Sequence, residues 1–412
     1  MLGYLLARAG VDVVVLEKHA DFLRDFRGDT IHPSTLEVVH ELGLLEDFLK
    51  HPHQELSQLA GQVGEDTIVL GDFSHLPTVC KFIAFMPQWD FLDFIAEHAE
   101  RYPRFRLLRN TEVTDLIERG GQVVGVKTET PEGPLEIFAD LVVGADGRTS
   151  VVRDVSGLQI ERLGAPIDVL WFRLPRQPDD QKQALGRFGN GKIMVMINRD
   201  TYWQCGYIIR KGALDSIKQR GLEPFRQDIL SLAPFLDDRV KEISEWDQLK
   251  LLTVLVDRLR KWYRPGLICI GDAAHAMSPV GGIGINLAIQ DAVAAANILW
   301  KPLFDGWVSP SHLQKVQWRR ELPTRLTQRA QIFVQDNVLN RVLNSPQPVA
   351  PWFLKLFKRF PVLRRIPARL IGIGVRPEHV RTPDVLAPRP PSSPPTAAFS
   401  LFDLLGFIPW PW

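Results

Sequence analysis

The sequence is poor in cysteine and has no excess of either charge. Its 412 residues include three cysteines, Cys80, Cys205 and Cys269, which lie far apart and form no C-x-x-C pair. A disulfide framework and a metal site are therefore not expected, and a reducing cytoplasm is the default location. The formal net charge of +1 gives no indication of nucleic acid as a partner.

Long apolar runs are also missing. No uninterrupted run approaches the roughly 20 residues of a membrane-spanning helix. Residues 352–376 mix bulky apolar side chains with Lys and Arg and contain no acid. This composition suits a helix lying peripherally on a membrane surface. It also suits a C-terminal helix pair packed on the body or on a second subunit, which we favour, and we expect a monomer or a homodimer.

The start of the sequence lacks a glycine-rich phosphate loop. The opening stretch MLGYLLARAGVDVVVLEK predicts a short helix from Leu2, a turn at Gly10, and a buried strand over residues 11–16 that ends at Glu17. Helix, turn, strand and acid form the second half of a dinucleotide-binding βαβ unit, whose first half is a strand followed by G-x-G-x-x-G. These residues alone leave open a nucleotide-binding protein and a chance likeness.

The strongest motif is GLICIGDAAHAMSPVGGIGINLAIQDA, residues 266–292. It predicts a short apolar strand that ends in an acid, then a glycine-rich turn that opens a long helix. Ligands of α/β sheets bind beyond the carboxyl ends of the strands, and a helix N-terminus favours an anionic group there. The residues that carry this interpretation are Asp272, Pro279, Gly281, Gly282, Gly284 and Asn286.

A second motif, DLVVGADGRTSVVRD at residues 140–154, repeats the pattern of a buried strand, an acid and a turn. Asp146 ends the strand, and Gly147 allows a strained backbone and a close approach by a cofactor. Strand–Asp–Gly turns are common without any ligand, so this motif alone leaves both interpretations open.

Together these motifs resemble the class A flavoprotein monooxygenases of the para-hydroxybenzoate hydroxylase and UbiH-like superfamily. The family pattern D-G-x-x-S-x-x-R stands here as Asp146, Gly147, Ser150 and Arg153, and its G-D motif as Gly271 and Asp272. The resemblance implies an α/β fold. A Rossmann-like FAD-binding domain without its first strand carries an inserted, mostly antiparallel β-sheet substrate domain and C-terminal helices.

The expected domain boundaries follow from this layout. The FAD-binding domain comprises residues 1–50, 86–160 and 262–300, and the substrate domain comprises residues 51–85 and 161–261. A C-terminal helical region spans 301–380, and a Pro-rich linker with an apolar tail spans 381–412. In the inserted sheet, Trp171, Phe172, Met194 and Trp203 suit either an aromatic pocket or core packing.

The resemblance implies FAD as the cofactor and assigns positions to it. Glu17 would hold the adenosine ribose, Asp272 the ribityl chain, and the backbone from Gly282 to Asn286 would follow the pyrimidine edge of the flavin. The full set of implied cofactor residues is Glu17, Arg27, Gln88, Asp146, Gly147, Gly271, Asp272, Pro279, Gly282, Gly284, Ile285 and Asn286. His275 suits either proton transfer near the flavin or, more commonly, a structural hydrogen bond.

The implied reaction is hydroxylation of an aromatic or other electron-rich small molecule. NAD(P)H would reduce FAD, and O2 would give a flavin C4a-hydroperoxide that transfers one oxygen atom. An FAD-dependent reductase or dehydrogenase of the same fold needs the same motifs, and a truncated, non-catalytic remnant is a further alternative. The family pattern places strand one and G-x-G-x-x-G directly before Met1, so we expect Met1 to be internal to a longer frame. The absent strand would lie beside both residues 11–17 and residues 266–272.

Overall fold

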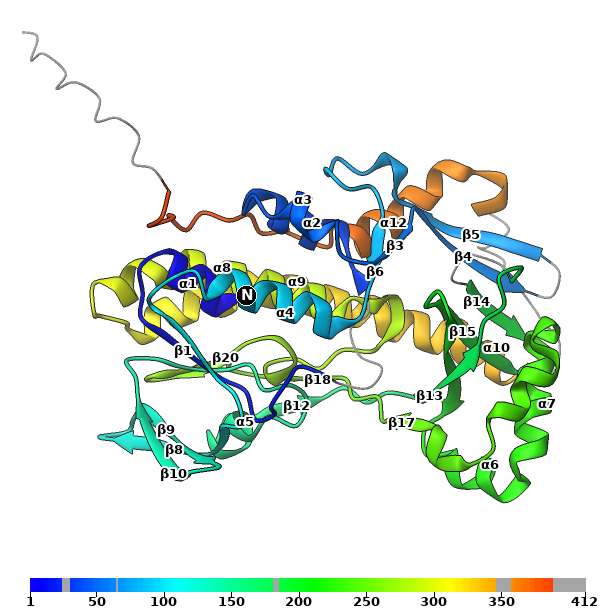
Figure 1. Ribbon diagram of the computed structural model, residues 1–412, viewed down its shortest axis with the longest axis horizontal. Helices are drawn as coiled ribbons and strands as arrows, with labels where there is room; N and C mark the ends of the chain where they lie inside the picture. The colour runs from blue at the N-terminus through cyan, green and yellow to red at the C-terminus, as the bar shows by residue number, and fades with distance from the viewer. Residues whose placement is uncertain (24–29, 64–65, 181–184, 346–356, 388–412) are drawn as a thin grey trace, which may run out of the picture.

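The computed structural model describes residues 1–23, 30–63, 66–180, 185–345 and 357–387 (Figure 1). Two long helices, α8 and α9, run side by side through the middle of the molecule, and α1 and α4 pack alongside α8 and α1 respectively. Small parallel sheets lie on one side of this helical layer, and a large antiparallel sheet closes one end (Figure 1). The predicted cofactor residue Arg27 and most of the predicted linker and tail, residues 388–412, lie outside the described residues.

Parallel strands form the part of the fold expected to bind a cofactor. Its elements are α1 (Leu2–Arg8), β1 (Val13–Leu16), α4 (Gln88–Ala99), β7 (Phe105–Leu108), β11 (Val142–Gly144), α5 (Val151–Val155), β19 (Tyr263–Arg264) and β20 (Leu267–Cys269). β1 pairs in parallel with β7, and β11 pairs in parallel with β20. The strand β1 is shorter than the predicted 11–16 and only half-buried, with Val14 36% exposed, so its prediction as a buried strand is wrong.

The neighbours of β20 correct one expectation. β20 has a ladder partner on each side, β11 in parallel and β19 through an antiparallel hairpin. The position beside residues 266–272 that was predicted for a further strand is therefore occupied, while the other predicted neighbour of that strand, residues 11–17, contains β1. Among the strands that the structure describes, β1 pairs only with β7 and β11 only with β20.

An antiparallel meander packs beside these strands. It consists of β8 (Glu112–Arg119), β9 (Gln122–Thr130) and β10 (Gly133–Phe138). Leu116, Val123 and Val126 from the meander share a hydrophobic core with Val142 of β11 and Leu267 of β20. The meander therefore packs against the strands β11 and β20, which are followed by Asp146 and Asp272.

The inserted domain is built on a seven-stranded sheet, as predicted mostly antiparallel. Its elements are β4 (Gln58–Val63), β5 (Asp66–Asp72), β13 (Ile167–Pro175), β14 (Leu185–Gly189), β15 (Lys192–Asn198), β16 (Tyr202–Arg210), β17 (Lys250–Leu252), α6 (Leu214–Arg220), α7 (Leu222–Leu232) and the 3-10 helices η2 (Pro234–Glu242) and η3 (Trp246–Gln248). The strand order is β17-β13-β16-β15-β14-β4-β5, in which only β14 and β4 run parallel. Segments 58–72 and 167–252 thus share one sheet, although the domain boundaries themselves stay a prediction.

The two faces of this sheet contact different parts of the protein. Successive side chains of a strand point to opposite faces. Phe172, Met194 and Trp203 are at most 1% exposed and pack with α7 and η2 in a closed core. Trp171 and Val195 point to the other face, where Val280 contacts the same hydrophobic cluster. Core packing thus accounts for one face, and the second face is directed at the glycine-rich turn.

The remaining elements connect these parts. They are β2 (Thr30–Ile31), α2 (Pro33–Glu41), α3 (Leu45–Phe48), β3 (Gln54–Leu56), η1 (Phe73–His75), β6 (Ile83–Phe85), β12 (Ile160–Arg162), β18 (Asp257–Leu259), η4 (Gly271–Ala273), η5 (Val280–Gly282), α8 (Gly284–Phe304), α9 (Pro310–Val334), the π-helix η6 (Gln335–Leu339), α10 (Asn340–Leu343), η7 (Pro361–Arg364) and α12 (Arg365–Gly372). Among the described residues, one stretch, Val280–Phe304, is long and apolar enough to span a membrane. However, 61% of an apolar segment of 18 residues within it is buried inside the protein. It is the core helix α8 together with the turn before it.

The beginning of the predicted Pro-rich linker is held to the body. Arg8 donates to the carbonyl of Pro383 at 3.2 Å and forms an ion pair with Asp384 at 3.5 Å. Tyr102 donates to the same carboxylate at 3.1 Å, and the N–H of Val385 donates to the Arg8 carbonyl. Residues 381–387 are therefore anchored beside α1, which composition alone did not predict.

A buried charge network joins α8 to α9 and to the C-terminal segment. The Asp291 carboxylate, fully buried, accepts from Arg320 Nε at 2.9 Å, from the N–H of Gly271 at 3.1 Å and contacts His275 Nε2 at 2.6 Å. Arg320 also contacts Glu378 at 3.3 Å. Burial raises the pKa of Asp291, but His275 and Arg320 more than offset this effect, so the pKa is lowered and the carboxylate stays ionised.

We expect Asp291→Asn to lower the free energy of unfolding by about 3–5 kcal/mol, because it leaves Arg320 buried with less compensating charge. Urea denaturation followed by circular dichroism measures this. The matched control is Asp305→Asn directly after the exposed end of the same helix, where Asp305 forms a surface ion pair with Lys301. The control should change stability by less than about 0.5 kcal/mol, and equal effects of the two substitutions would contradict the account.

Candidate cofactor site

The site begins where β20 ends. Gly271 takes a left-handed conformation with φ +58°, and Asp272 follows it. The Asp272 Oδ2 atom accepts from Arg148 Nε at 2.9 Å, and both side chains are about a quarter exposed. A Cβ atom at Gly284 would lie 3.9 Å from Asp272 Oδ1. The carboxylate therefore stands between an arginine and the first turn of α8.

Arg148 was not among the residues predicted from the sequence. It follows Gly147 in the second motif and brings that motif to Asp272, 124 positions along the chain. Its Nη1 atom is buried and has no hydrogen-bond partner among the described residues. An arginine directly after a strand-end Asp–Gly pair is the signal that could have identified it.

The Asp146 turn is organised around its own short helix. The Asp146 carboxylate accepts from the Ser150 hydroxyl and, at 3.1 Å, from the N–H of Val152. Ser150 in turn caps α5 by accepting from the N–H of Arg153 at 2.9 Å. Gly147 has φ +87°, and a Cβ there would meet no atom within 4 Å, so the backbone is open on that side.

The turn before α8 is the tightest part of the site. Gly281 and Gly282 have φ values of +79° and +64°, which residues with side chains rarely adopt. A Cβ at Gly282 would overlap the Oγ1 atom of Thr30, whose hydroxyl donates to the Gly282 carbonyl at 3.0 Å. Pro279 precedes the turn, and Ile283 before α8 provides no side-chain cap.

Asn286 fixes this turn to the β2 strand. Its Oδ1 accepts from the N–H of His32 and from the Thr35 hydroxyl, each at 2.8 Å. Its Nδ2 donates to the carbonyls of Thr30 at 2.9 Å and Gly282 at 3.2 Å. The polar atoms of the Asn286 side chain are thus all hydrogen-bonded to protein groups. A ligand would instead contact the backbone N–H groups of the first helical turn.

The other predicted residues are distributed around this centre. His275 is buried, packs against Trp262 in a tilted arrangement with a ring-centroid distance of 4.9 Å and contacts Asp291, so it has structural partners. Glu17 follows β1, and its carboxylate accepts from the N–H of His19 at 3.0 Å. Gln88 opens α4, three residues beyond the strand that pairs with Thr30.

His32 is a buried histidine that sequence reasoning missed. Its Nδ1 contacts the Ile371 carbonyl at 2.8 Å, and its Nε2 is buried with no partner among the described residues. Burial lowers the pKa of His32 to about 4, so the ring is neutral at physiological pH and Nδ1 carries the hydrogen. His32 therefore links the turn of α8 to the C-terminal helix α12.

These features fit an anionic dinucleotide cofactor. The first N–H groups of a helix have no intrahelical partners, and here a left-handed glycine turn exposes them beside a carboxylate. The unpartnered Arg148 Nη1 offers a further buried donor at the same place. Asp272 suits cofactor hydroxyl groups, and the helix start suits a ring or phosphate with negative charge.

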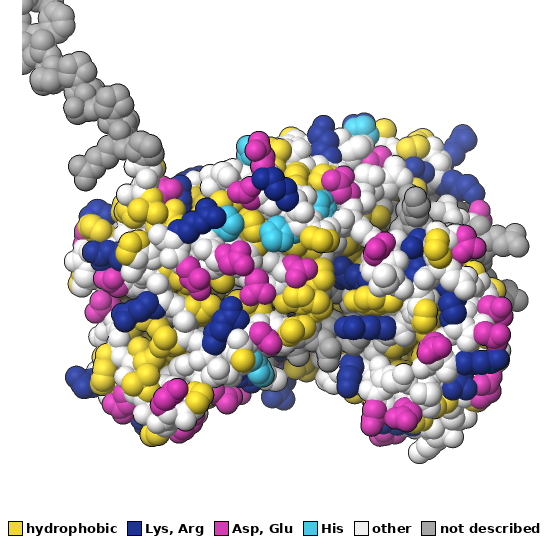
Figure 2. Space-filling model, viewed as in Figure 1, with side chains coloured by type: hydrophobic (Ala, Val, Ile, Leu, Met, Phe, Trp, Pro, Cys, Tyr) yellow, Lys and Arg dark blue, Asp and Glu magenta, His cyan; other side chains and the backbone are white. Residues whose placement is uncertain are grey.

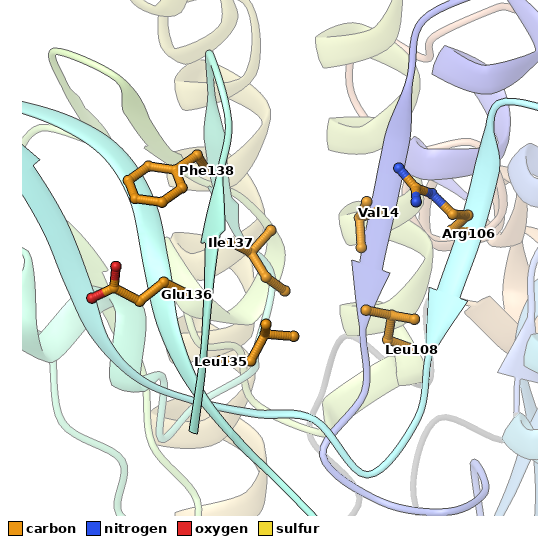
Figure 3. A pocket seen from close by; sticks show the side chains of 7 residues that line it. All are labelled: Val14, Arg106, Leu108, Leu135, Glu136, Ile137 and Phe138. Atoms are coloured by element: carbon orange, nitrogen blue, oxygen red, sulfur yellow. The ribbon is translucent and has the colours of Figure 1, made fainter. Parts of the chain in front are cut away.

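A separate pocket of about 270 Å³ lies between β1, β7 and β10 (Figure 3). Leu135 and Ile137 face Val14 and Leu108 across it, while Glu136 and Phe138 point away (Figure 3). Its lining residues are Val14, Arg106, Leu108, Leu135, Glu136, Ile137 and Phe138. None of them is a predicted cofactor residue and no polar groups converge, so we interpret it as a gap in packing between two sheets.

The strand-end carboxylate and the glycine turn at α8 define an α/β protein that binds a dinucleotide cofactor. The chain belongs to the FAD binding domain family, whose pattern matches residues 1–330. This confirms the predicted fold class and FAD as the cofactor. The role of each individual site residue stays a prediction, as does the expectation about the start of the chain.

Alignments with known proteins cover most of the chain. It is 31% identical to 6-methylpretetramide 4-monooxygenase of Streptomyces rimosus over 92% of this chain and 91% of that protein. It is 25% identical to a rifampicin monooxygenase of Rhodococcus hoagii, over 94% of this chain and 79% of that protein. The structure of p-nitrophenol 4-monooxygenase PnpA from Pseudomonas putida DLL-E4 matches with a TM-score of 0.70 at 21% identity, covering 91% and 95% of the two chains, which shows the shared fold.

We expect Gly282→Ala to lower the free energy of unfolding by about 2–3 kcal/mol and to weaken FAD binding, because it combines a left-handed conformation with overlap on Thr30. Gly306→Ala is the matched control, since Gly306 has φ +72° but no atom within 4 Å of a Cβ. The control should cost only about 1 kcal/mol and leave FAD binding unchanged. Urea denaturation and FAD titration measure both effects, and equal losses in the two variants would count against a tight turn.

His32 predicts a pH dependence of stability. Its pKa falls from 6.5 in the unfolded chain to about 4 in the folded protein, so between these values the unfolded state binds the additional proton. Stability should then decrease as pH falls below 6.5, by about 1.4 kcal/mol per pH unit from this group. His32→Asn keeps an N–H donor for Ile371 and removes the titration. Its unfolding free energy should depend less steeply on pH, and identical slopes for both proteins would refute the assignment.

Proposed function

We propose that this chain is an NAD(P)H-consuming, FAD-dependent monooxygenase that hydroxylates an aromatic small molecule with oxygen from O2. The observation that carries the proposal is the glycine turn at the start of α8, held beside Asp272 and Arg148. The similarity to a monooxygenase over 92% of the chain supports the type of reaction.

The chain's own residues would hold and orient the cofactor. Bound FAD supplies the redox chemistry that activates oxygen. Asp272 accepts hydrogen bonds from cofactor hydroxyl groups, and Arg148 keeps the carboxylate in place and adds a donor. The first turn of α8, with its unpaired backbone N–H groups and the positive end of its dipole, would stabilise negative charge on a cofactor ring held there. The Asn286 contacts keep this turn rigid.

The surroundings of the turn support an apolar, aromatic substrate. Trp171 lies over Gly206 on the second face of the large sheet, with a Cβ at Gly206 3.0 Å from its ring. Val195 and Ile371 join Trp171 beside a buried core that includes Phe85. This side of the sheet meets Val280 of the turn, so a flat apolar molecule between sheet and turn would be shielded from water.

The alternatives from the sequence differ in their products. A reductase or dehydrogenase would use FAD at the same site without placing oxygen from O2 in the product. A non-catalytic remnant would bind no FAD and oxidise no NAD(P)H. No feature among the described residues favours either alternative over hydroxylation. A cytoplasmic location and a monomeric or homodimeric state stay predictions.

Isotope labelling tests the proposal. The full chain is purified with added FAD and supplied with NAD(P)H, labelled O2 and a panel of phenols and polycyclic aromatic compounds. We expect a flavin-coloured protein and a hydroxylated product in which one oxygen atom comes from O2. Substrate-dependent NAD(P)H oxidation with an unlabelled product would instead favour the reductase. A colourless protein that consumes no NAD(P)H would favour the remnant.

A further inference from the structure

The segment around α12 exposes a row of large apolar side chains. Phe360, Val362, Ile366 and Leu370 are 53%, 65%, 59% and 48% exposed. Val362, Ile366 and Leu370 are spaced four residues apart, which places them on one side of a helical path. The sequence favoured a C-terminal helix pair packed on the body or on a second subunit. In the structure α12 packs on the body through its other side and leaves these residues at the surface.

The opposite side of α12 holds the helix in a fixed orientation. Ala368 and Gly372 are buried. The backbone of Ala368 lies against Gly71, and a Cβ at Gly372 would overlap the side chains of Leu76 and Phe73. Residues two positions apart on a helix point in nearly opposite directions. With Ala368 and Gly372 facing inward, Ile366 and Leu370 are directed outward.

Basic side chains flank the exposed apolar row. Arg365 and Arg369 are exposed on α12, Lys358 and Arg359 are exposed just before it, and no Asp or Glu occurs from residue 357 to 377. Figure 2 shows hydrophobic and basic side chains side by side at the upper right edge of the molecule, where this segment runs. We call these exposed residues, from Lys358 to Leu370, the basic apolar face.

Few acidic groups of the neighbouring elements oppose this charge. β5 contributes Asp66, which is exposed and pairs with Lys358 at 3.2 Å, and Asp72, which accepts from the N–H of Ser74. η1 contributes His75, whose Nε2 lies 3.4 Å from Arg365. The face therefore keeps a positive balance and fits an anionic, apolar partner.

A second exposed apolar row lies on α9. Trp318, Leu322 and Leu326 are 80%, 47% and 38% exposed, also four residues apart. They alternate with Glu321 and Arg325, which pair with each other at 2.6 Å. Lys315 and Arg329 are also exposed on α9, so this row too lies near basic side chains. It differs from the basic apolar face in containing an acid, and the test compares the two rows directly.

We propose that the basic apolar face docks the protein on the surface of an anionic phospholipid bilayer. Ile366 and Leu370 enter the boundary between headgroups and acyl chains, and Arg365 and Arg369 contact the lipid phosphates. The inner side of the same segment reaches the candidate cofactor site, because Ile371 contacts both His32 and the Gly281 turn. Docking would therefore place the site close to apolar molecules dissolved in the membrane. The proposal does not depend on the reaction that the site performs.

Sedimentation with lipid vesicles tests this. The full chain is mixed with vesicles of phosphatidylglycerol or of phosphatidylcholine at about 0.1 M and about 1 M salt. We expect binding to the anionic vesicles at the lower salt concentration and at least several-fold weaker binding at the higher one. Arg365→Gln with Arg369→Gln should weaken binding by roughly 25-fold, since each lost basic residue accounts for about five-fold.

Matched substitutions of apolar residues distinguish binding through this face from nonspecific hydrophobic adsorption. Ile366→Ser with Leu370→Ser should also abolish most binding, whereas Leu322→Ser with Leu326→Ser on α9 should leave it unchanged. Circular dichroism checks that every variant folds. Equal binding to both lipids, equal losses from the α9 and α12 variants, or no binding by the wild-type chain would overturn the proposal. So would a dimer that Ile366→Ser with Leu370→Ser converts to a monomer, because the face would then cover a second copy.

Discussion

The start of α8 is held in place by two buried polar side chains one and a half turns apart, Asn286 and Asp291. Asn286 connects it to β2 and α2, and Asp291 connects it to the Gly271 turn and to Arg320 of α9. Buried polar groups of this kind are stabilising only when all partners are present. The helix N-terminus is therefore held by several hydrogen bonds although no side chain caps it. Its free N–H groups are available because the side chains nearby are already committed.

This constraint explains why segments far apart in the chain meet at one point. Asp272 follows β20, Arg148 follows β11, and Thr30 begins β2, yet all three lie around the first turn of α8. The parallel strands bring the first two together, since the carboxyl ends of parallel strands meet at one edge of a sheet. The antiparallel sheet adds an apolar wall through Trp171 and Val195. The turn thus has polar groups on one side and an apolar surface on the other. A site with both can bind a polar cofactor and an aromatic substrate together.

The sequence predicted those parts of the site that local rules determine. Strand-end acids such as Asp272 and the G-G-x-G turn are visible because their chemistry is contained in a few adjacent residues. Arg148, Asp291 and His32 were missed because their roles come from partners 124, 29 and 339 positions away. A single acid inside the apolar run of α8 was an available signal for Asp291. The neighbours of β20 were predicted wrongly because the short β19 hairpin has too few residues to show a pattern.

The central claim is that the turn before α8 and its first N–H groups contact FAD. Hydrogen–deuterium exchange with and without FAD measures this most directly, since a contacted amide exchanges more slowly. The account predicts slower exchange over residues 280–286 and around Asp272, with little change over residues 135–138 of the pocket beside β10. Unchanged exchange at the turn, or protection confined to residues 135–138, would contradict it.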